Sequence, residues 1–496
     1  MAAQAAIPTQ HQPVEHTERA RNLLERPWAL ALAIAIPLTL AYLIWMPPAA
    51  DLAAAIYRSD LFARVGYTLR DSGWYAAHGH YLLGYSLLSP ALGALLGVRV
   101  LLASSALAAS VLFGLIAERA FGPATGRVSA AVFALGICAE LLSGRVPYDL
   151  GFAIGLGSVL AMMRGRAVLA LVLAVLTSAA SPVAGAFLAL AFLAWALAEW
   201  SLSLSRPGES AIAVRGFTRS SERSPPSPSP GRPWIWPLAL TIAALAPIAL
   251  LNVAFPEGGY EPFAPSSFWP ALAGVLLIAL LLPQGPLTPR AWRIVRVGLA
   301  LYALVLIGSF AIETPVGGNA ARLGPTLAAP LLAGVLWDGR RKALYLLAPV
   351  LLYWQLNTPI GDLSLVSGQQ SANASYYAPL LSELQRLRHD APTIVEVPLT
   401  AGHWEAAYVA GHDGVSLARG WERQLDTRYA ALFYRPGLTA SAYRSWLREN
   451  RVVYVALPDA RLDYAGQTEG ALVAHGLPYL REVWHSQHWR LYRVIG

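Results

Sequence analysis

The chain has 496 residues, of which 56% are hydrophobic and only 13% are charged, and its mean hydropathy is +0.46. Soluble globular proteins seldom reach such values, so the composition predicts a membrane protein. The formal net charge of +8 belongs to the hydrophobic part, because acids and arginines balance from residue 357 onward, and orientation in a membrane explains it better than binding of nucleic acid does.

Apolar stretches long enough to cross a bilayer, or to pack inside a bundle, recur as far as residue 356. They predict a polytopic α-helical membrane domain over residues 1–356 with about eleven transmembrane helices. The stretches cover residues 28–46, 100–116, 128–142, 150–163, 167–180, 183–198, 234–255, 271–282, 297–312, 325–337 and 343–356.

A further apolar run at 81–97 has Pro90 in its middle. If this run does not cross, the arginine-bearing loops all fall on one side, which the positive-inside rule makes cytoplasmic. Those loops are 119–127, 164–166, 206–232, 290–296 and 340–342. We therefore interpret 81–97 as a re-entrant or interfacial helix at the outer face. The amino end is then inside, the carboxyl end is outside, and the expected location is a bacterial plasma membrane.

Two segments differ from the apolar bundle in composition. Residues 205–232 are rich in Ser, Pro and Arg, which predicts a disordered cytoplasmic linker. Residues 357–496 alternate short apolar strands with helical segments and predict an extracytoplasmic α/β domain. The expected strands are 393–399, 452–458 and 489–495, and the expected helices are 441–450 and 469–476.

On this topology, the polar residues of the membrane domain gather in its outer loops. The candidates are Asp51, Arg58, Asp60, Trp74, Tyr75, His78 and His80 in the first loop, Arg145 and Asp149 in "SGRVPYDLG", and Asn319 and Arg322 in "ETPVGGNAARLG". Loops between membrane helices that face an external domain predict a cavity at the boundary between lipid and water.

Asp51 and Arg322 are the clearest of these candidates. Asp51 follows the first predicted span after only "PPAA", with no opposite charge closer than Arg58. An acid at the membrane surface is costly unless it is used, although capping of a helix is the alternative reading. Arg322 is a lone cation after a Gly-Gly-Asn turn, a place that suits a lipid phosphate.

The remaining loop residues have two readings each. Asp60 and Arg64 stand four apart on an expected helix, where they can simply pair with each other. His78 and His80 are either site residues or part of an interfacial aromatic belt, and H-x-H alone is weak evidence for a metal. The Trp-Tyr pair before them can stack on a sugar or anchor the loop at the interface.

The external domain contains a segment, "AGHWEAAYVAGHDGVSLARGWERQLD" (401–426), that concentrates aromatic and charged residues. Exposed indoles beside charged groups can bind sugars, because the indole face covers the C–H side of a sugar while the charged groups bond its hydroxyls. The alternative is a buried pair of tryptophans beside a salt-bridged helix. We expect the segment to face the cavity above Asp51 and to bind the acceptor through His403, Trp404, Glu405, Trp421 and Arg423.

These features together resemble the GT-C superfamily of glycosyltransferases, which use polyprenyl-phosphate sugars. The resemblance rests on an acid just after the first span (Asp51), an aromatic first outer loop, "SGRVPYDLG" in the second loop, a late Asn/Arg loop and an external α/β domain. The chain also resembles actinobacterial-type multi-pass membrane proteins in "WYAAHGH", "HWEAAYVA" and "LARGWERQLD".

The GT-C resemblance implies a polyprenyl-phosphate-linked sugar donor and an envelope glycan, lipid or protein as the acceptor. It implies Asp51 as catalytic base. Many members carry a second acid next to the first, but here Leu52 follows, so that role falls to Asp60, to Asp149 or to no residue. Arg322, Asn319, Arg58 and Arg145 are then expected at the donor phosphate, and a divalent metal is possible, with Asp149 as a ligand. A single displacement with one carboxylate base would invert the anomeric centre.

Two other classes of function fit the composition. One is a multi-pass transporter or flippase whose external domain gates a pore, and the other is a non-catalytic scaffold for envelope assembly. Ion-coupled transporters usually keep ionisable residues at the middle of the membrane. The predicted spans show none there and no repeat, so the sequence favours the enzyme.

Overall fold

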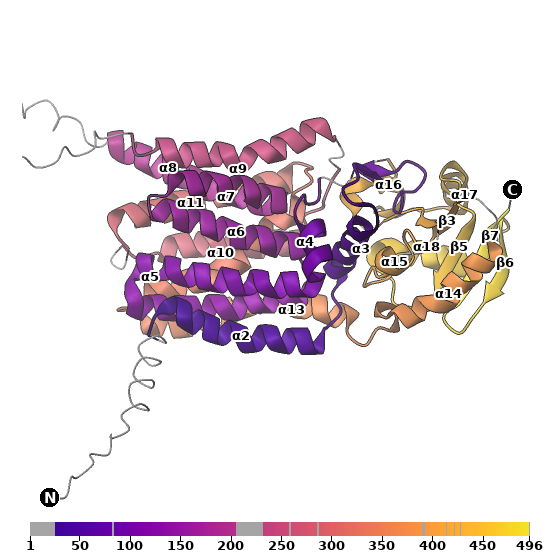
Figure 1. Ribbon diagram of the computed structural model, residues 1–496, viewed down its shortest axis with the longest axis horizontal. Coiled ribbons are helices and arrows are strands. Elements are labelled where there is room, and N and C mark those ends of the chain that lie inside the picture. Colours follow the sequence, from indigo (N-terminus) through magenta and orange to yellow (C-terminus); the bar gives the residue numbers. More distant parts are fainter. Residues whose placement is uncertain are drawn as a thin grey trace, which may run out of the picture.

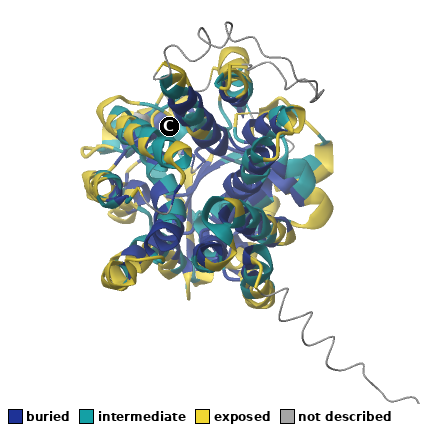
Figure 2. Cartoon of the chain, turned by 90° about the vertical axis from the view of Figure 1, so that its left-hand side faces the viewer, coloured by how far each residue is buried: buried dark blue, intermediate teal, exposed yellow. Residues whose placement is uncertain are grey.

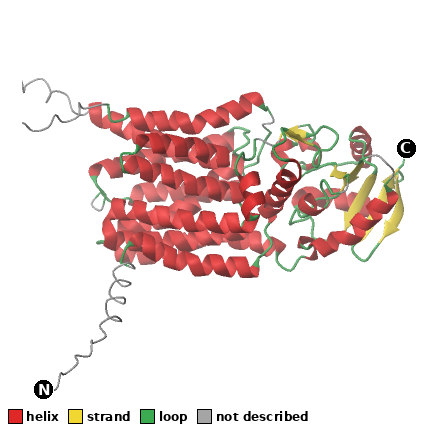
Figure 3. Ribbon diagram, viewed as in Figure 1, coloured by secondary structure: helices red, strands yellow, loops and turns green. Residues whose placement is uncertain are grey.

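A computed structural model describes residues 25–81, 84–204, 232–256, 259–284, 287–388, 392–412, 414–420, 422–426 and 428–495. In it the chain forms a bundle of helices with an α/β domain at one end (Figure 1). The strands lie in or beside that domain (Figure 3). The predicted linker, apart from Arg232, falls outside the described residues.

Every apolar stretch predicted as a span falls on a helix of the bundle. The helices are α2 (Pro27–Trp45), α5 (Val98–Ala139), α6 (Val146–Met163), α7 (Ala167–Ala180), α8 (Pro182–Leu204), α9 (Ile235–Ala254), α10 (Pro265–Leu281), α11 (Pro289–Ala311), α12 (Leu323–Leu336) and α13 (Arg341–Val366). Helix α13 runs past the predicted domain boundary at 356, because Pro359 lies inside the helix and does not end it.

Helix α5 holds two of the predicted stretches, because the chain changes direction inside it. Gly122 has a φ of 79° and a ψ of 171°, values that an L side chain rarely adopts, and Pro123 follows it. A Cβ at Gly126 would lie 2.8 Å from the carbonyl oxygen of Ala117, so the two arms pack backbone to backbone beside the bend.

The outer surface of the bundle suits lipid. The described part of the chain contains six helices long and apolar enough to cross a membrane: Pro27–Trp45, Val98–Leu142, Val146–Met163, Pro182–Leu204, Ile235–Ala254 and Pro289–Ala311. The bundle turns its buried faces inward and its exposed faces outward (Figure 2), and outward side chains such as Val253, Leu280 and Leu346 are large and apolar. The number of crossings and the direction of insertion stay predictions.

Two short helices lie between the bundle and the α/β domain (Figure 1). They are α3 (Ala50–Val65) and α4 (Ser89–Leu96), and the loop between them carries the two-stranded pair β1 (Arg70–Asp71) and β2 (His80–Tyr81). Helix α4 is the only helical part of the predicted run 81–97 among its described residues, and its 8 residues span about 12 Å. That length is too short to cross a bilayer. It therefore agrees with the interpretation of residues 81–97 as a re-entrant or interfacial helix.

The α/β domain is a five-stranded sheet with helices. Its elements are η3 (Gln370–Ala372), α14 (Ala374–Leu387), β3 (Thr393–Glu396), α15 (Glu405–Tyr408), β4 (Val415–Leu417), η4 (Arg423–Leu425), α16 (Ala430–Phe433), α17 (Ala440–Glu449), β5 (Tyr454–Pro458), α18 (Tyr464–Ala474), β6 (Leu480–His485) and β7 (Trp489–Val494). The three predicted strands and both predicted helices are confirmed, whereas β4, β6 and α14 were not predicted.

The sheet is mixed, with strand order β4-β3-β5-β7-β6. Strands β4, β3 and β5 are parallel, while β7 runs antiparallel to both β5 and β6. Helix α14 buries Tyr377, Leu380 and Leu384, spaced three and four residues apart on one face, in the core that also holds Trp489. The same core continues into the bundle, where it holds Leu101 and Phe133, so the α/β domain and the bundle share one hydrophobic cluster.

The first outer loop continues the edge of this sheet. The backbone N–H of Leu417 in β4 donates to the carbonyl of Gly73 at 2.8 Å, and the N–H of Ala76 donates to the carbonyl of Leu417 at 3.1 Å. The indole N–H of Trp74, between them, donates to the carbonyl of Ala406 at 3.2 Å. The loop therefore joins the membrane bundle to the external domain.

The orientation of the bundle makes a prediction that reporter fusions can test. Helix α2 begins, and helix α8 ends, at the end of the bundle opposite the α/β domain (Figure 1). A reporter that is active only outside the cytoplasm should therefore be inactive when fused after Arg232 and active when fused after Gly496. Activity at both positions, or at neither, would contradict the predicted topology.

Candidate functional site

Arg145 is the centre of a charged cluster at the end of the bundle that meets the external domain. Its Nε donates to Asp51 Oδ2 at 3.1 Å, its Nη1 to Glu140 Oε2 at 3.2 Å and its Nη2 to Asp362 Oδ2 at 2.9 Å. The hydroxyl of Ser143 also donates to Asp362, at 2.7 Å. Four elements thus meet here: the first turn of α3, η1 (Glu140–Leu142), the start of α6 and the last turns of α13.

Local sequence explains why these elements can meet. Gly144 has a φ of 75°, and a Cβ there would lie 2.9 Å from the Cβ atoms of Ala49 and Leu52, so only glycine lets this turn approach α3 closely. Asp51 stands in the first turn of α3, where the helix dipole favours an acid. It caps no backbone N–H, so its carboxylate is left for Arg145 and the site.

Arg322 lies beside this cluster at the end of η2 (Gly317–Arg322). Its guanidinium carbon is 5.6 Å from the ring centre of Tyr148, and no described carboxylate forms an ion pair with it. Asn319 is half-buried in the same short helix. The loop 313–324 therefore brings a cation without an ion-pair partner among the described residues to the site, and its binding of a phosphate stays a prediction.

Electrostatics distinguish the two arginines. Burial alone would lower the pKa of Arg145, but the carboxylates of Glu140, Asp362 and Asp51 raise it above its ordinary value. Burial and the neighbouring charge of Arg145 lower the pKa of Arg322. The positive charge of Arg145 is thus compensated by three carboxylates. The positive charge of Arg322 is not compensated by an ion pair with a described residue, so it favours binding of an anion.

The acids of the cluster do not fit a bound metal as they are arranged. Within the described ranges, no three His, Cys, Asp or Glu side chains are grouped so as to hold one. Asp149, the expected ligand, is 1% exposed, and neither of its carboxylate oxygens forms a hydrogen bond. The oxygens of Asp51, Glu140 and Asp362 point at Arg145 instead.

Arg58 joins the bundle to the α/β domain and is buried, with 3% of its side chain exposed. It forms a buried salt bridge with Glu422 of the external domain at 2.8 Å. Its guanidinium carbon also lies 4.2 Å from the ring centre of Tyr85 and 5.3 Å from that of Trp74. Arg58 therefore forms an interdomain contact instead of the expected contact with the donor phosphate.

Replacing Arg58 by alanine is expected to lower the free energy of unfolding by roughly 3–5 kcal/mol, because Glu422 would stay buried without its partner. The apparent melting temperature of the purified chain, followed by tryptophan fluorescence, measures the loss. Arg64→Ala is the control, because Arg64 lies on the same helix but is exposed and bonds only backbone oxygens. Equal losses in both variants would contradict a dominant Arg58–Glu422 contact.

The aromatic residues of the first loop pack between the domains and do not present a sugar-binding face. Trp74 is 0% exposed and stacks on Tyr57, with ring centres 4.8 Å apart. The hydroxyl of Tyr75 donates to the carbonyls of Gly420 and Glu422, each at 2.9 Å. The expectation that Trp74 and Tyr75 stack on a sugar is therefore wrong.

The two histidines of this loop have different surroundings. His78 is exposed, whereas His80 is buried beside Trp74, and neither of its ring nitrogens forms a hydrogen bond. Burial, with the nearby charge of Arg58, lowers the pKa of His80 to about 4. His80 is therefore neutral at physiological pH and does not reach an acceptor.

His403 is an acceptor-side candidate that the structure leaves partly exposed, with 15% of its side chain accessible. Its Nε2 lies 3.2 Å from Asp463 Oδ2, and its φ of 54° is one that histidine adopts more readily than most residues. Burial alone would lower its pKa, but the bond to Asp463 raises it, and the charges of Glu405 and Asp51 act in the same direction.

The other acceptor candidates in the external segment are internal or fall outside the description. Trp404 is 2% exposed and stacks on Tyr408, so its indole belongs to the core, as the alternative reading held. Glu405 is 0% exposed and accepts bonds from the N–H and hydroxyl of Thr400 at 3.0 and 2.6 Å. Trp421 and the side chain of Arg423 lie outside the described residues.

Asp60 is not part of the cluster. It is exposed on α3, nine positions after Asp51, which places the two acids roughly 13 Å apart along the helix axis. Arg64 bonds the backbone carbonyl of Asp60 at 3.4 Å and not its carboxylate. The structure therefore separates Asp60 from the catalytic role that the sequence assigned to it.

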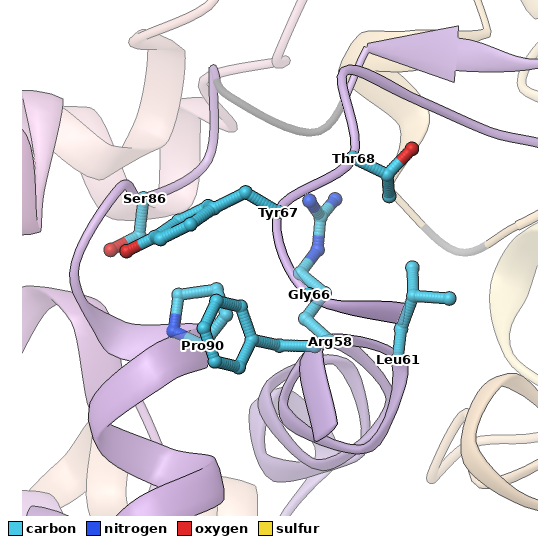
Figure 4. Close-up of a pocket in the computed structure, with 8 residues that line it drawn as sticks. Arg58, Leu61, Gly66, Tyr67, Thr68, Ser86 and Pro90 are labelled. Atoms are coloured by element: carbon cyan, nitrogen blue, oxygen red, sulfur yellow. The ribbon is translucent and has the colours of Figure 1, made fainter. Parts of the chain in front are cut away.

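One recess lies beside Arg58, between α3, the first loop and α4. Figure 4 shows the guanidinium of Arg58 between Tyr67 and Thr68, with the ring of Tyr67 extending toward Ser86. The recess holds about 30 Å³, enough for roughly one or two water molecules. It is too small for a sugar, so it is not the substrate site.

Asp362, Glu140 and Glu422 are site residues that the sequence did not identify as such. Asp362 lies in "PIGDLS", which the predicted boundary assigned to the external domain, and Glu140 seemed only the end of a span. Their contacts with Arg145 and Arg58 join residues far apart in the chain. An acid close to the outer end of an apolar helix was the available signal for the first two.

No protein-family description and no curated protein matches the chain. It is similar to the archaeal oligosaccharyltransferase AglB from Archaeoglobus fulgidus in complex with an inhibitory peptide and a dolichol-phosphate, at 11% identity and a TM-score of 0.47, over 86% of this chain and 69% of that one. It is also similar to the A. fulgidus oligosaccharyltransferase tethered with an acceptor peptide containing the NVT sequon, at 12% identity and a TM-score of 0.47, over 88% and 70%. This similarity is too weak to assign a role to any single residue of this chain.

Proposed function

We propose that the protein transfers a sugar from a polyprenyl-phosphate-linked donor to an envelope glycan, lipid or protein at the outer face of a bacterial plasma membrane. The observation that supports this most is that Asp51 bonds Arg145 at 3.1 Å while Arg322 lies 5.6 Å from the ring centre of Tyr148, three residues after Arg145. The apolar outer surface of the bundle suits the lipid part of such a donor, and the polar cluster suits its phosphate.

The chemistry needs a base and a cation, and the cluster offers both. Arg145 holds Oδ2 of Asp51, and no described residue bonds the other oxygen, Oδ1. In the proposed step the acceptor oxygen attacks the anomeric carbon, and its proton passes to Oδ1. The bond from that carbon to the phosphate oxygen breaks, and the phosphate leaves with the electron pair and binds Arg322. One displacement of this kind inverts the anomeric centre.

The external domain supplies the acceptor side of this proposal. His403 is held by Asp463 through Nε2 and belongs to the segment that is proposed to bind the acceptor. Arg58 and Glu422 fix the position of the domain over α3. The charged groups stand at the outer end of the bundle, which does not favour an ion-coupled transporter.

A transfer assay tests the function directly. The purified full-length chain in lipid nanodiscs is incubated with a panel of radiolabelled polyprenyl-phosphate sugars and an envelope extract as acceptor. We expect label to move from at least one donor to the acceptor, with inverted stereochemistry. No transfer from any donor, with the chain shown to be folded, would refute the proposed activity.

A further inference from the structure

The guanidinium of Arg145 binds three carboxylates at once, each through a different nitrogen. The three acids come from three elements: Asp51 from α3, Glu140 from η1 and Asp362 from α13. Arg145 is mostly buried, with 13% of its side chain exposed, so water does little to screen these contacts. A single positive group therefore sets the positions of all three acids.

Carboxylates are the ligands that a hard divalent cation prefers in proteins, but the described acids of this cluster are not grouped so as to hold one. Their oxygens surround a side chain that is always charged and has five N–H donors in a rigid fork. A lysine in its place would keep the charge and three N–H donors, but it would lose the planar fork that presents a separate nitrogen to each acid.

We propose that Arg145 takes the place of a divalent cation in this site, so that Asp51 is positioned by a guanidinium and transfer is independent of added metal. The proposal rests on the proposed function for its link to transfer. The arrangement of the three acids does not depend on it. Arg145 is accordingly a positioning residue, and it acts on the acceptor through Asp51.

The proposal implies that removing Arg145 exposes a latent cation site. In Arg145→Ala, three carboxylates would repel one another unless a cation replaced the guanidinium. We expect the purified full-length variant to bind one Mn²⁺ per chain, at least about tenfold tighter than the wild type does, with Mn²⁺ measured by electron paramagnetic resonance. Arg145→Ala combined with Asp362→Asn should lose that binding.

Arg322→Ala is the matched control, because it removes the same charge from the same cluster without vacating the point between the three acids. It should bind Mn²⁺ no better than the wild type. If Arg145→Ala and Arg322→Ala bind Mn²⁺ equally, the effect is one of net charge and the proposal is wrong.

Measurements on the wild-type chain test the proposal even if Arg145→Ala does not fold. The wild type should show no Mn²⁺ site that depends on Asp362, and its apparent melting temperature should not change on addition of EDTA. A stoichiometric Mn²⁺ site in the wild type that disappears in Asp362→Asn would overturn the proposal. These readouts use no sugar donor, so a failure of the transfer assay would refute the function and leave this test intact.

Discussion

Replacing Asp51 by asparagine is expected to lower sugar transfer by roughly a hundredfold or more, because a general base contributes a factor of that size. The amide still fits between the neighbours of Asp51 and can accept a bond from Arg145 Nε through its oxygen. The fold should therefore survive. The measurement is kcat/KM with the donor found in the transfer assay, alongside gel filtration of the variant.

Asp60→Asn is the control for this prediction, because it makes the same change on the same helix at an exposed position outside the cluster. It should keep near-full activity. If Asp60→Asn or Asp149→Asn abolishes transfer while Asp51→Asn does not, the base has been assigned to the wrong acid.

Replacing Arg322 by glutamine is expected to lower kcat/KM by about a hundredfold, because the departing phosphate loses its cation in a site sheltered from water. Arg322→Lys should recover part of the rate, since it restores the charge without the planar fork. Arg340→Gln, which removes an exposed arginine from the loop between α12 and α13, serves as the control. Normal turnover by Arg322→Gln would show that another group binds the phosphate.

The bundle could be predicted from the sequence because a membrane span is a local property of composition and length. The end of α13 could not, because Pro359 looks like a helix stop but is tolerated inside the helix. Strands β4 and β6 could not be predicted either. Strand β4 has only three residues, and the exposed β6 has no apolar alternation.

The site was predictable only in part. Asp51, Arg145 and Arg322 were expected together because topology sends all three loops to one face. Their partners were not expected, because which acid an arginine meets depends on how helices pack, and no spacing in the sequence encodes that. Trp74 and Trp404 show the same limit, since a loop tryptophan looks identical in sequence whether it is exposed or buried.

The pairing of the first outer loop with β4 has a consequence for biosynthesis. Strand β4 is an edge of the external sheet, and an uncovered edge is a template for aggregation. The cover, Gly73 to Ala76, leaves the ribosome hundreds of residues before β4 does. The external domain would thus emerge beside a complementary strand that is already anchored to the bundle, whereas the same domain expressed alone would have to hide its bare edge by pairing with another copy.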